Sequence, residues 1–394
     1  HWESLRLDMP AISVRDIRVK DDSTCLCADL VAGTHGRGFW ILDDITPLRQ
    51  MAAVKKAAAA NEAYLFKPNT AVRVRFATND PTPWPPEVPA GENGPQGAVL
   101  DYWLPPGITG ATKLEIVDAA GKTLRTFRST DPVLEPDAYR DPVAYNKVCQ
   151  RTITAPHCQF PLYWAAPSDA LSNRPGAHRW VWDMRYEPLP GGGTSTTGAV
   201  PHRIYDVANA PYVVPGTYTV RLTAGGKAYT QPLTLRLDPR VKMPATALAQ
   251  LNTLTKEMRD GAVATRAAYD KARALAGALE SAGGADALAL KAQVDSIAPP
   301  AAPGGGRGGR GFGGRGGAPQ GPPNLESAAA QMMAAAMGMQ SADAPPTANN
   351  VTACDRARAA SKAAMAKWTA LSTTGLTALN AKRKAAGQPP IEVP

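Results

Sequence analysis

The densest group of polar side chains follows a short strand-like segment near residue 30. His35 and Arg37 lie in a glycine-containing turn, Trp40 follows in an apolar stretch, and Asp43 and Asp44 end that stretch. Two carboxylates serve as acid and base in glycoside hydrolysis when they face each other across a substrate. Adjacent strand residues point to opposite faces, so Asp43 and Asp44 cannot form that pair by themselves. We therefore treat these five residues as candidate binding residues and predict no catalytic residue in this chain.

The same five residues also have a structural interpretation. Asp43 or Asp44 would cap a turn, Arg37 would pair with that carboxylate, and Trp40 would pack into a core. These are ordinary features of β-sheets, so the residue types favour this interpretation over ligand binding.

Four residues near position 180 could form an aromatic sugar-binding platform: Trp180, Trp182, Asp183 and Tyr186. Flat rings stack on pyranose faces, and residues at i and i+2 share one face of a strand. In a two-layer β fold that face is more often the core. We interpret Trp180 and Trp182 as core residues, with the sugar platform as the alternative.

No motif in the sequence predicts a cofactor or a metal ion. Gly121-Lys122-Thr123 is similar to the end of a phosphate-binding loop, but Ile116 stands where that motif needs its first glycine. The patterns GxGxxG, GxSxG, HExxH and the EF-hand loop do not occur. The cysteines show no paired CxxC or CxxH spacing, so we predict no zinc site.

The five cysteines leave the redox state open. Cys149 and Cys158 bracket a short proline-containing loop, and a disulfide between them fits this spacing if the chain is exported. Cys25 and Cys27 flank a single residue, and in an extended strand their side chains point to opposite faces. A bond between these two would require a turn.

The first 240 residues are close to neutral, so their net charge does not predict a nucleic-acid-binding surface. The chain has 43 Lys and Arg against 34 Asp and Glu, and most of the excess lies after residue 241. Residues 304–317 are glycine-rich and carry three arginines and Phe312, a composition typical of RNA-binding Arg-Gly segments. A nucleic-acid groove would also draw on a folded basic face. We therefore interpret this tract as a flexible linker, with nucleic-acid association as the lesser alternative.

Hydrophobic periodicity divides the chain into β and helical parts, so the predicted fold class is multidomain β plus α. Residues 1–50 read as strands of a β-meander, residues 51–63 as a short helix or tether, and residues 64–240 as an immunoglobulin-like or fibronectin-like sandwich. Residues 241–394 predict a helical hairpin with a disordered, Gly/Pro/Arg-rich insert at 299–323. No stretch of 18 apolar residues occurs, so we predict no membrane span. A three-stranded meander is marginal in water, so we expect its further strands upstream of His1.

Residues 31–44, with the sequence VAGTHGRGFWILDD, resemble the closing blade of large bacterial β-propellers of the sortilin-like, BNR-repeat type. Proteins of this group are commonly labelled glycosyl hydrolases. The Asp-box hairpin of BNR repeats is missing from residues 1–50. The resemblance covers most of the chain, because phrases of the group's C-terminal region also occur at 65–68, 97–104, 179–183, 215–220 and 389–390.

The resemblance implies an exported protein, periplasmic or extracellular, in which an upstream propeller precedes a sandwich and a helical hairpin. In related propeller glycosidases the acidic residues come from several blades, so no catalytic residue transfers to this chain. The expected role is an accessory and interaction region, associated with glycoside hydrolysis or carbohydrate binding by the upstream propeller. Its expected partners are that propeller and a glycan or peptide ligand. The alternative is a non-catalytic, sortilin-like module that binds peptides or proteins.

Overall fold

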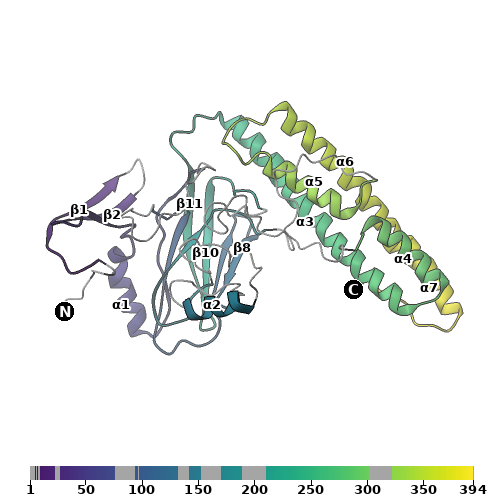
Figure 1. Ribbon diagram of the computed structural model, residues 1–394, viewed down its shortest axis with the longest axis horizontal. Coiled ribbons are helices and arrows are strands. Elements are labelled where there is room, and N and C mark those ends of the chain that lie inside the picture. Colours follow the sequence, from purple (N-terminus) through teal and green to yellow (C-terminus); the bar gives the residue numbers. More distant parts are fainter. Residues whose placement is uncertain are drawn as a thin grey trace. The chain divides into compact units, whose positions relative to one another are not determined.

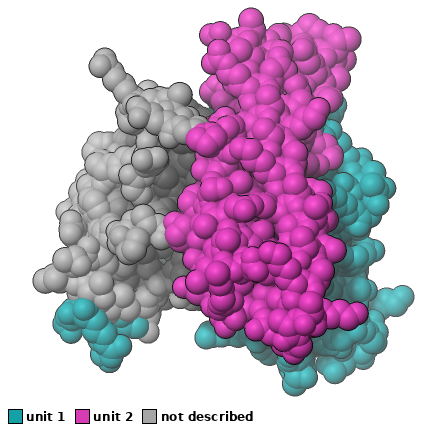
Figure 2. Space-filling view, turned by 90° about the vertical axis from the view of Figure 1, so that its right-hand side faces the viewer, with its two compact units in different colours: residues 1–76, 81–187, 213–241 teal, residues 77–80, 188–212, 242–394 magenta. Residues whose placement is uncertain are grey.

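The computed structural model describes residues 5, 7, 9–22, 27–75, 94–95, 97–131, 142–151, 170–188, 210–300 and 322–393. The chain forms two compact units (Figure 2). The first comprises residues 1–76, 81–187 and 213–241 and contains the β-sheets. The second comprises residues 77–80, 188–212 and 242–394 and contains the long helices. This confirms the predicted combination of a β part and a later helical part.

A small antiparallel sheet forms the N-terminal part of the first unit (Figure 1). It consists of β1 (Val14–Asp22), β2 (Cys27–Thr34) and β3 (Phe39–Leu42), joined in the order β1-β2-β3. Gly36 and Gly38 turn the chain between β2 and β3 with φ of 85° and 65°, a region that glycine adopts without steric cost. The meander predicted for residues 1–50 is present in the described part of this segment.

The register of this sheet places six apolar side chains on one face, whereas Val31, Phe39 and Ile41 lie on the other. Directly opposite residues of neighbouring antiparallel strands share a face. Ile17 and Val19 of β1 are 57% and 51% exposed, so the β1 side of one face is open to solvent, while Leu30, Ala32, Trp40 and Leu42 on the same face are half-buried. This face is called the apolar face below and consists of Ile17, Ala32 and Trp40 in one row and of Val19, Leu30 and Leu42 in the next.

A short helical segment connects this sheet to the rest of the first unit. The 3-10 turn η1 (Leu48–Gln50) leads into α1 (Met51–Ala59), which confirms the helix predicted within residues 51–63. The Gln50 side chain accepts a hydrogen bond from the Lys67 amide at 2.9 Å and donates one to the Lys67 carbonyl at 2.9 Å. The Tyr64 hydroxyl donates to the same side chain at 3.1 Å.

Two further sheets make up the described core of the first unit. One has the order β4-β6-β9, from β4 (Tyr64–Leu65), β6 (Ala98–Leu104) and β9 (Gly176–Trp182). The other has the order β5-β11-β10-β7-β8, from β5 (Ala71–Arg73), β7 (Lys113–Val117), β8 (Thr123–Arg128), β10 (Gly216–Ala224) and β11 (Lys227–Leu237).

Three features of this part of the chain concern its connections: a hairpin turn, a parallel strand pairing and a short helix. Gly225 and Gly226 form the hairpin turn between β10 and β11, both with positive φ, as the Gly-Gly pair between two strand-like segments indicates. Strand β5 pairs with β11 in parallel, a pairing that the alternation of its residues does not indicate. Helix α2 (Pro142–Arg151) is an element that the sequence interpretation missed.

Aromatic rings of β9 contact rings of the five-stranded sheet. Trp180 lies 4.9 Å from Phe127 of β8 and Trp182 lies 6.1 Å from Tyr218 of β10, measured between ring centroids. Trp182 is fully buried, and its indole N–H donates to the Arg185 carbonyl at 3.0 Å. These contacts support the interpretation of both tryptophans as packing residues rather than as a sugar platform.

Helices are present after residue 241, as predicted. Helix α3 (Ala245–Ala282) is followed by α4 (Ala285–Ile297), after two glycines of positive φ. Then come α5 (Leu325–Met337), α6 (Ala348–Ala370), the π-helical turn η4 (Leu371–Gly375) and α7 (Leu376–Ala385). The predicted insert at 299–323 lies mostly outside the described residues. None of the helices in the described part has the length and hydropathy needed to cross a bilayer.

Small residues let these helices pack closely. Helix α3 runs beside α5 and α6 (Figure 1). A Cβ atom built on Gly261 would lie 2.2 Å from the terminal methyl of Met332, so the glycine makes room for α5. The hydroxyls of Thr265 and Ser361 form a buried hydrogen bond of 2.8 Å between α3 and α6. The helical unit is therefore more than the predicted two-helix hairpin, because α4 and α5 also contribute residues to its apolar core.

Candidate functional site

The five candidate binding residues occupy three places in the first unit. His35 and Arg37 lie exposed in the turn between β2 and β3. Trp40 belongs to the apolar face, and Asp43 and Asp44 line a separate polar pocket. The sequence interpretation grouped these residues because they are close in the chain, whereas the strand geometry separates them.

The polar pocket has a volume of about 290 Å³ and contains three carboxylates. Asp43 and Asp44 come from the segment after β3, and Asp29 comes from β2. We call it the acidic pocket. The segments around residues 70 and 97 complete its wall: Ala28, Asn69, Thr70, Ala71, Val72, Gly94, Pro95, Gly97 and Val99.

Glycine is required at one point of this wall. A Cβ atom on Gly97 would lie 2.3 Å from the Trp182 carbonyl oxygen, a distance that real Cβ atoms do not show. The backbone before β6 can therefore approach β9 this closely only because residue 97 has no side chain.

Backbone hydrogen bonds fix the acidic segment against β2. The Asp44 amide donates to Asp29 Oδ1 at 3.0 Å, and the Ile45 amide donates to the Ala28 carbonyl at 2.7 Å. Asp44 has a φ of 49°, and its Oδ1 accepts a hydrogen bond from the Thr46 amide at 3.0 Å. Aspartate tolerates this left-handed conformation because its side chain bonds to the local backbone.

The structural interpretation of the five residues is correct in part. Asp44 does cap a turn, as predicted. Within the described ranges no ion pair involves Arg37, and Arg179 of β9 contacts the Asp43–Asp44 segment instead. Trp40 is half-buried, and its indole nitrogen finds no hydrogen-bond partner among the described residues.

Burial and like charge set the protonation behaviour of the pocket. Burial raises the pKa of the Asp43 carboxyl, the nearby Asp29 carboxylate adds to this rise, and the Arg179 guanidinium opposes it. Burial also raises the pKa of Asp101, behind the pocket, although Arg179 donates two hydrogen bonds to that carboxylate. Asp43 therefore holds a proton more readily than an exposed aspartate would.

The acidic pocket does not have the geometry of a metal site. In the described part of the chain no three His, Cys, Asp or Glu side chains are arranged to hold a metal ion. The carboxylates instead accept backbone N–H groups or face the pocket. What the arrangement offers chemically is a polar cavity with negative charge, suited to hydroxyl-rich or cationic groups.

Sequence reasoning missed Asp29, Asp101 and Arg179. Asp29 and Asp101 lie in strands and Arg179 lies about 80 residues beyond Asp101, so proximity in the chain gave no indication. One signal was present: Asp101 is a charged residue in the middle of the otherwise apolar strand 98–104. A buried strand carries such a charge only with a partner, and the partner is Arg179 directly opposite on β9.

A second cavity, of about 370 Å³, lies at the apolar face. Five of the six residues of that face line it, Trp40 among them, together with Val14 and Ile41. Leu5, Leu7 and Met9, at alternate positions before β1, also line it. The apolar surface thus continues from the sheet into the preceding segment.

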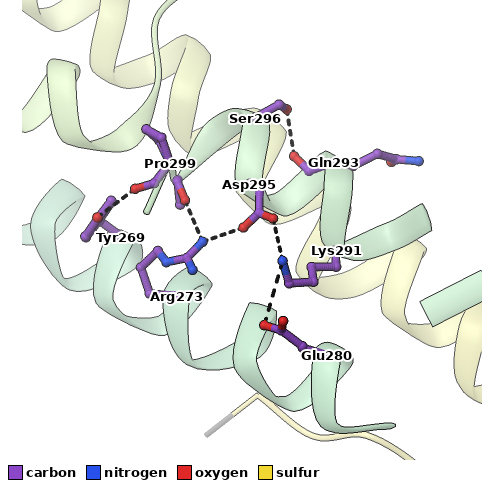
Figure 3. A network of polar contacts seen from close by, with 9 residues as sticks. Tyr269, Arg273, Glu280, Lys291, Gln293, Asp295, Ser296 and Pro299 are labelled. Atoms are coloured by element: carbon purple, nitrogen blue, oxygen red, sulfur yellow. Dashed lines mark hydrogen bonds and ion pairs between the residues drawn. The ribbon is translucent and has the colours of Figure 1, made fainter. Parts of the chain in front are cut away.

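The helical unit contains a polar network between α3 and α4 (Figure 3). Arg273 of α3 bonds to Asp295 and to the Ala298 carbonyl, and Lys291 donates to the other oxygen of Asp295 at 2.9 Å. The Tyr269 hydroxyl donates to the Pro299 carbonyl at 2.8 Å. The carboxylate is matched by two cations, and the network fastens the end of α4 to α3 rather than leaving groups available for a ligand.

The cysteine predictions remain largely outside the described residues. The Cys149 side chain and Cys158 both lie there, so the proposed disulfide stays a prediction. Cys354 of α6 is a free thiol in the core, and burial raises its pKa.

Comparison with known proteins adds no identification. No protein-family model, curated protein or solved structure matches the chain. The likeness to sortilin-like propellers therefore depends on the sequence phrases quoted above.

Proposed function

We propose that this chain is the accessory and interaction region of an exported β-propeller protein, in which β1–β3 packs as a blade against other blades. The observation that carries the proposal is the apolar face. Six apolar residues share one side of a three-stranded sheet, and the cavity beside them is lined by more apolar side chains. Exposed apolar surfaces of this kind mark interaction sites.

A neighbouring blade fits this face in its chemistry. Packed sheets lie about 10 Å apart and interdigitate apolar side chains. Export and the bacterial propeller context come from the sequence resemblance.

The remaining sheets of the first unit then serve as an immunoglobulin-like sandwich. Their support is the antiparallel strand order β11-β10-β7-β8 and the ring contacts between β9 and the five-stranded sheet. The helical unit follows as a separate packed body with its own core. Neither part needs an open apolar surface of its own for this role.

The experiment for this proposal is to sequence the reading frame upstream of His1. The proposal predicts repeated strand hairpins of roughly 40–50 residues each, the length of a propeller blade, together with a signal peptide. A start codon immediately before His1 would overturn the blade assignment, because no further blades would then precede this sheet.

A role in carbohydrate processing is the second candidate, favoured by the acidic pocket. In this reading the raised pKa of Asp43 suits a carboxyl group that holds a proton for transfer, with the opposing carboxylate supplied by another blade. The alternative is a sortilin-like pocket that binds a cationic peptide without chemistry. Both roles would use the acidic pocket, but only the first would convert a bound glycan to product.

Two substitutions in the full-length protein separate these roles. Asp43→Asn should lower the hydrolysis of a cleaved glycan by about 100-fold if Asp43 transfers a proton. The matched control, Asp16→Asn, changes an exposed aspartate of β1 that lies outside the pocket. Unchanged hydrolysis in both Asp43→Asn and Asp44→Asn would remove these residues from any mechanism. Saturable peptide binding without turnover would favour the sortilin-like role.

A further inference from the structure

Arg179 of β9 uses its guanidinium to hold two different parts of the first unit. Its Nε donates to Asp101 Oδ1 at 2.9 Å and its Nη2 donates to Asp101 Oδ2 at 3.3 Å. Its Nη1 also donates to the Asp43 carbonyl at 2.7 Å, and Nη2 to the Asp44 carbonyl at 2.9 Å. Only the planar fork of arginine can bind a carboxylate and two carbonyls in this way.

The two groups that Arg179 holds belong to different sheets. Asp101 lies on β6, directly opposite Arg179 in the β4-β6-β9 sheet. The Asp43 and Asp44 carbonyls belong to the segment that leaves β3 of the β1-β2-β3 sheet. One side chain therefore bridges the sheet of the apolar face to its neighbour in the same unit.

The acidic segment is held from both sides at this point. Its amides donate hydrogen bonds to Asp29 Oδ1 and the Ala28 carbonyl of β2. Its carbonyls accept hydrogen bonds from Arg179. The left-handed φ of Asp44 turns its carbonyl and that of Asp43 toward the same guanidinium. With the carbonyls released, nothing described on the β9 side would keep this conformation.

Burial makes the bridge costly to open. Asp101 is 8% exposed, and the Arg179 side chain is 31% exposed at the salt bridge. A buried carboxylate that loses its partner is strongly unfavourable, so the pair stays closed. Arg179 cannot turn away to solvent without leaving Asp101 unpaired.

We propose that Arg179, oriented by Asp101, is a positioning residue that latches the Asp43–Asp44 segment and makes the β1–β3 sheet move with the β4-β6-β9 sheet as one body. The latch fixes the wall of the acidic pocket, because two of its three carboxylates lie on the latched segment. This inference does not depend on the propeller assignment, since it concerns contacts within the chain.

Hydrogen exchange of the full chain tests the latch at the peptide that covers residues 43–50. Arg179→Gln should make its amides exchange about tenfold faster or more, since two charge-assisted hydrogen bonds to this segment are lost. Arg179→Lys should give a smaller change, because an ammonium cannot reproduce the fork. The peptides of β10 and β11 should keep their wild-type exchange. The matched control is Arg125→Gln, which removes an arginine of β8 that pairs with Glu187.

A second variant separates the latch from the stability of the ion pair. In Asp101→Leu/Arg179→Met the partly buried pair is replaced by apolar residues, a change that is often neutral for stability. The fold should remain, whereas residues 43–50 should still exchange about tenfold faster. Unchanged exchange of this peptide in the double variant would overturn the proposal. Equally faster exchange throughout the first unit would also overturn it, since Arg179 would then only stabilise the fold.

Discussion

The β1–β3 sheet and the helical unit use apolar residues in opposite ways. In the helical unit the apolar positions of α3, α4 and α6 meet each other, and Leu275, Leu279 and Val294 are completely buried. In the β1–β3 sheet six apolar residues share one face, yet Ile17 and Val19 remain more than half exposed. The helical unit buries these apolar side chains within itself, whereas the sheet leaves part of its apolar face exposed.

The difference follows from the geometry of the two elements. A helical hairpin closes its own apolar stripes, because helices joined in sequence can fold back on one another. A flat three-stranded sheet cannot cover its own face and needs a second layer. Apolar residues therefore yield a closed core in one region and an exposed surface in the other.

The largest effect should come from opening the closed core. Leu275→Ala removes a completely buried side chain of α3 and should lower the free energy of unfolding of the helical unit by roughly 2–5 kcal/mol. Urea denaturation followed by helical circular dichroism measures this change. Leu288→Ala, at a 49% exposed position of α4, is the control and should cost less than about 0.5 kcal/mol. Equal costs at both positions would show that the core is loosely packed.

A smaller effect should come from the ion pair between α3 and α6. Arg358 donates to both oxygens of Glu257, at 2.7 and 2.9 Å, and this bonding lowers the pKa of Glu257 below its ordinary value of 4.5. Both side chains are more than two-fifths exposed, so solvent screens the pair and Glu257→Gln should cost about 0.5–1 kcal/mol at pH 7.

The pH dependence of that pair has a definite sign. Because the folded pKa of Glu257 is depressed, its contribution is present above 4.5 and is lost as pH falls through the lowered pKa. The difference between wild type and Glu257→Gln should therefore be measurable at pH 7 and shrink below pH 4.5. Glu280→Gln, a 69% exposed residue at 3.8 Å from Lys291, serves as the control. A difference that grows on acidification would contradict the assignment.

The smallest effect on stability should come from the apolar face itself. Ile17→Lys/Val19→Lys changes two exposed positions, so the chain on its own should lose no more than about 0.5 kcal/mol. Binding of a hydrophobic dye should nevertheless fall, because the exposed apolar surface is interrupted. Arg18→Gln/Lys20→Gln on the opposite face should leave dye binding unchanged. A large loss of stability in the lysine variant would mean that these side chains are already covered.

Local patterns were enough to predict most of the elements. Apolar and charged residues alternate in 16–20, which predicts the strand observed there. Leu248, Leu251, Leu254 and Met258 recur at intervals of three and four residues, which predicts the helix observed there. The change of period near residue 240 also separated the β part from the helical part. These signals are local, because each depends on the repeat of a single strand or helix.

The candidate site was harder to predict because it depends on register. Asp43 and Asp44 were identified from the sequence, but the residues that contact them were not. Asp29 and Arg179 come close to them only through strand pairing. Trp40 is three residues from Asp43 and lies on a different surface, since the strand alternates its side chains. The place of the strands in their sheets, and not the distance along the chain, decides which side chains meet.

Hydrogen exchange of the unmodified chain measures whether the β1–β3 sheet lacks a covering layer. Amides within β1 and β2 should exchange at least about 100-fold faster than those of β10 and β11, because a sheet with one open face unfolds locally at low free energy. Equal protection of the two sheets would contradict the account, since it would show that β1–β3 is stable without a partner.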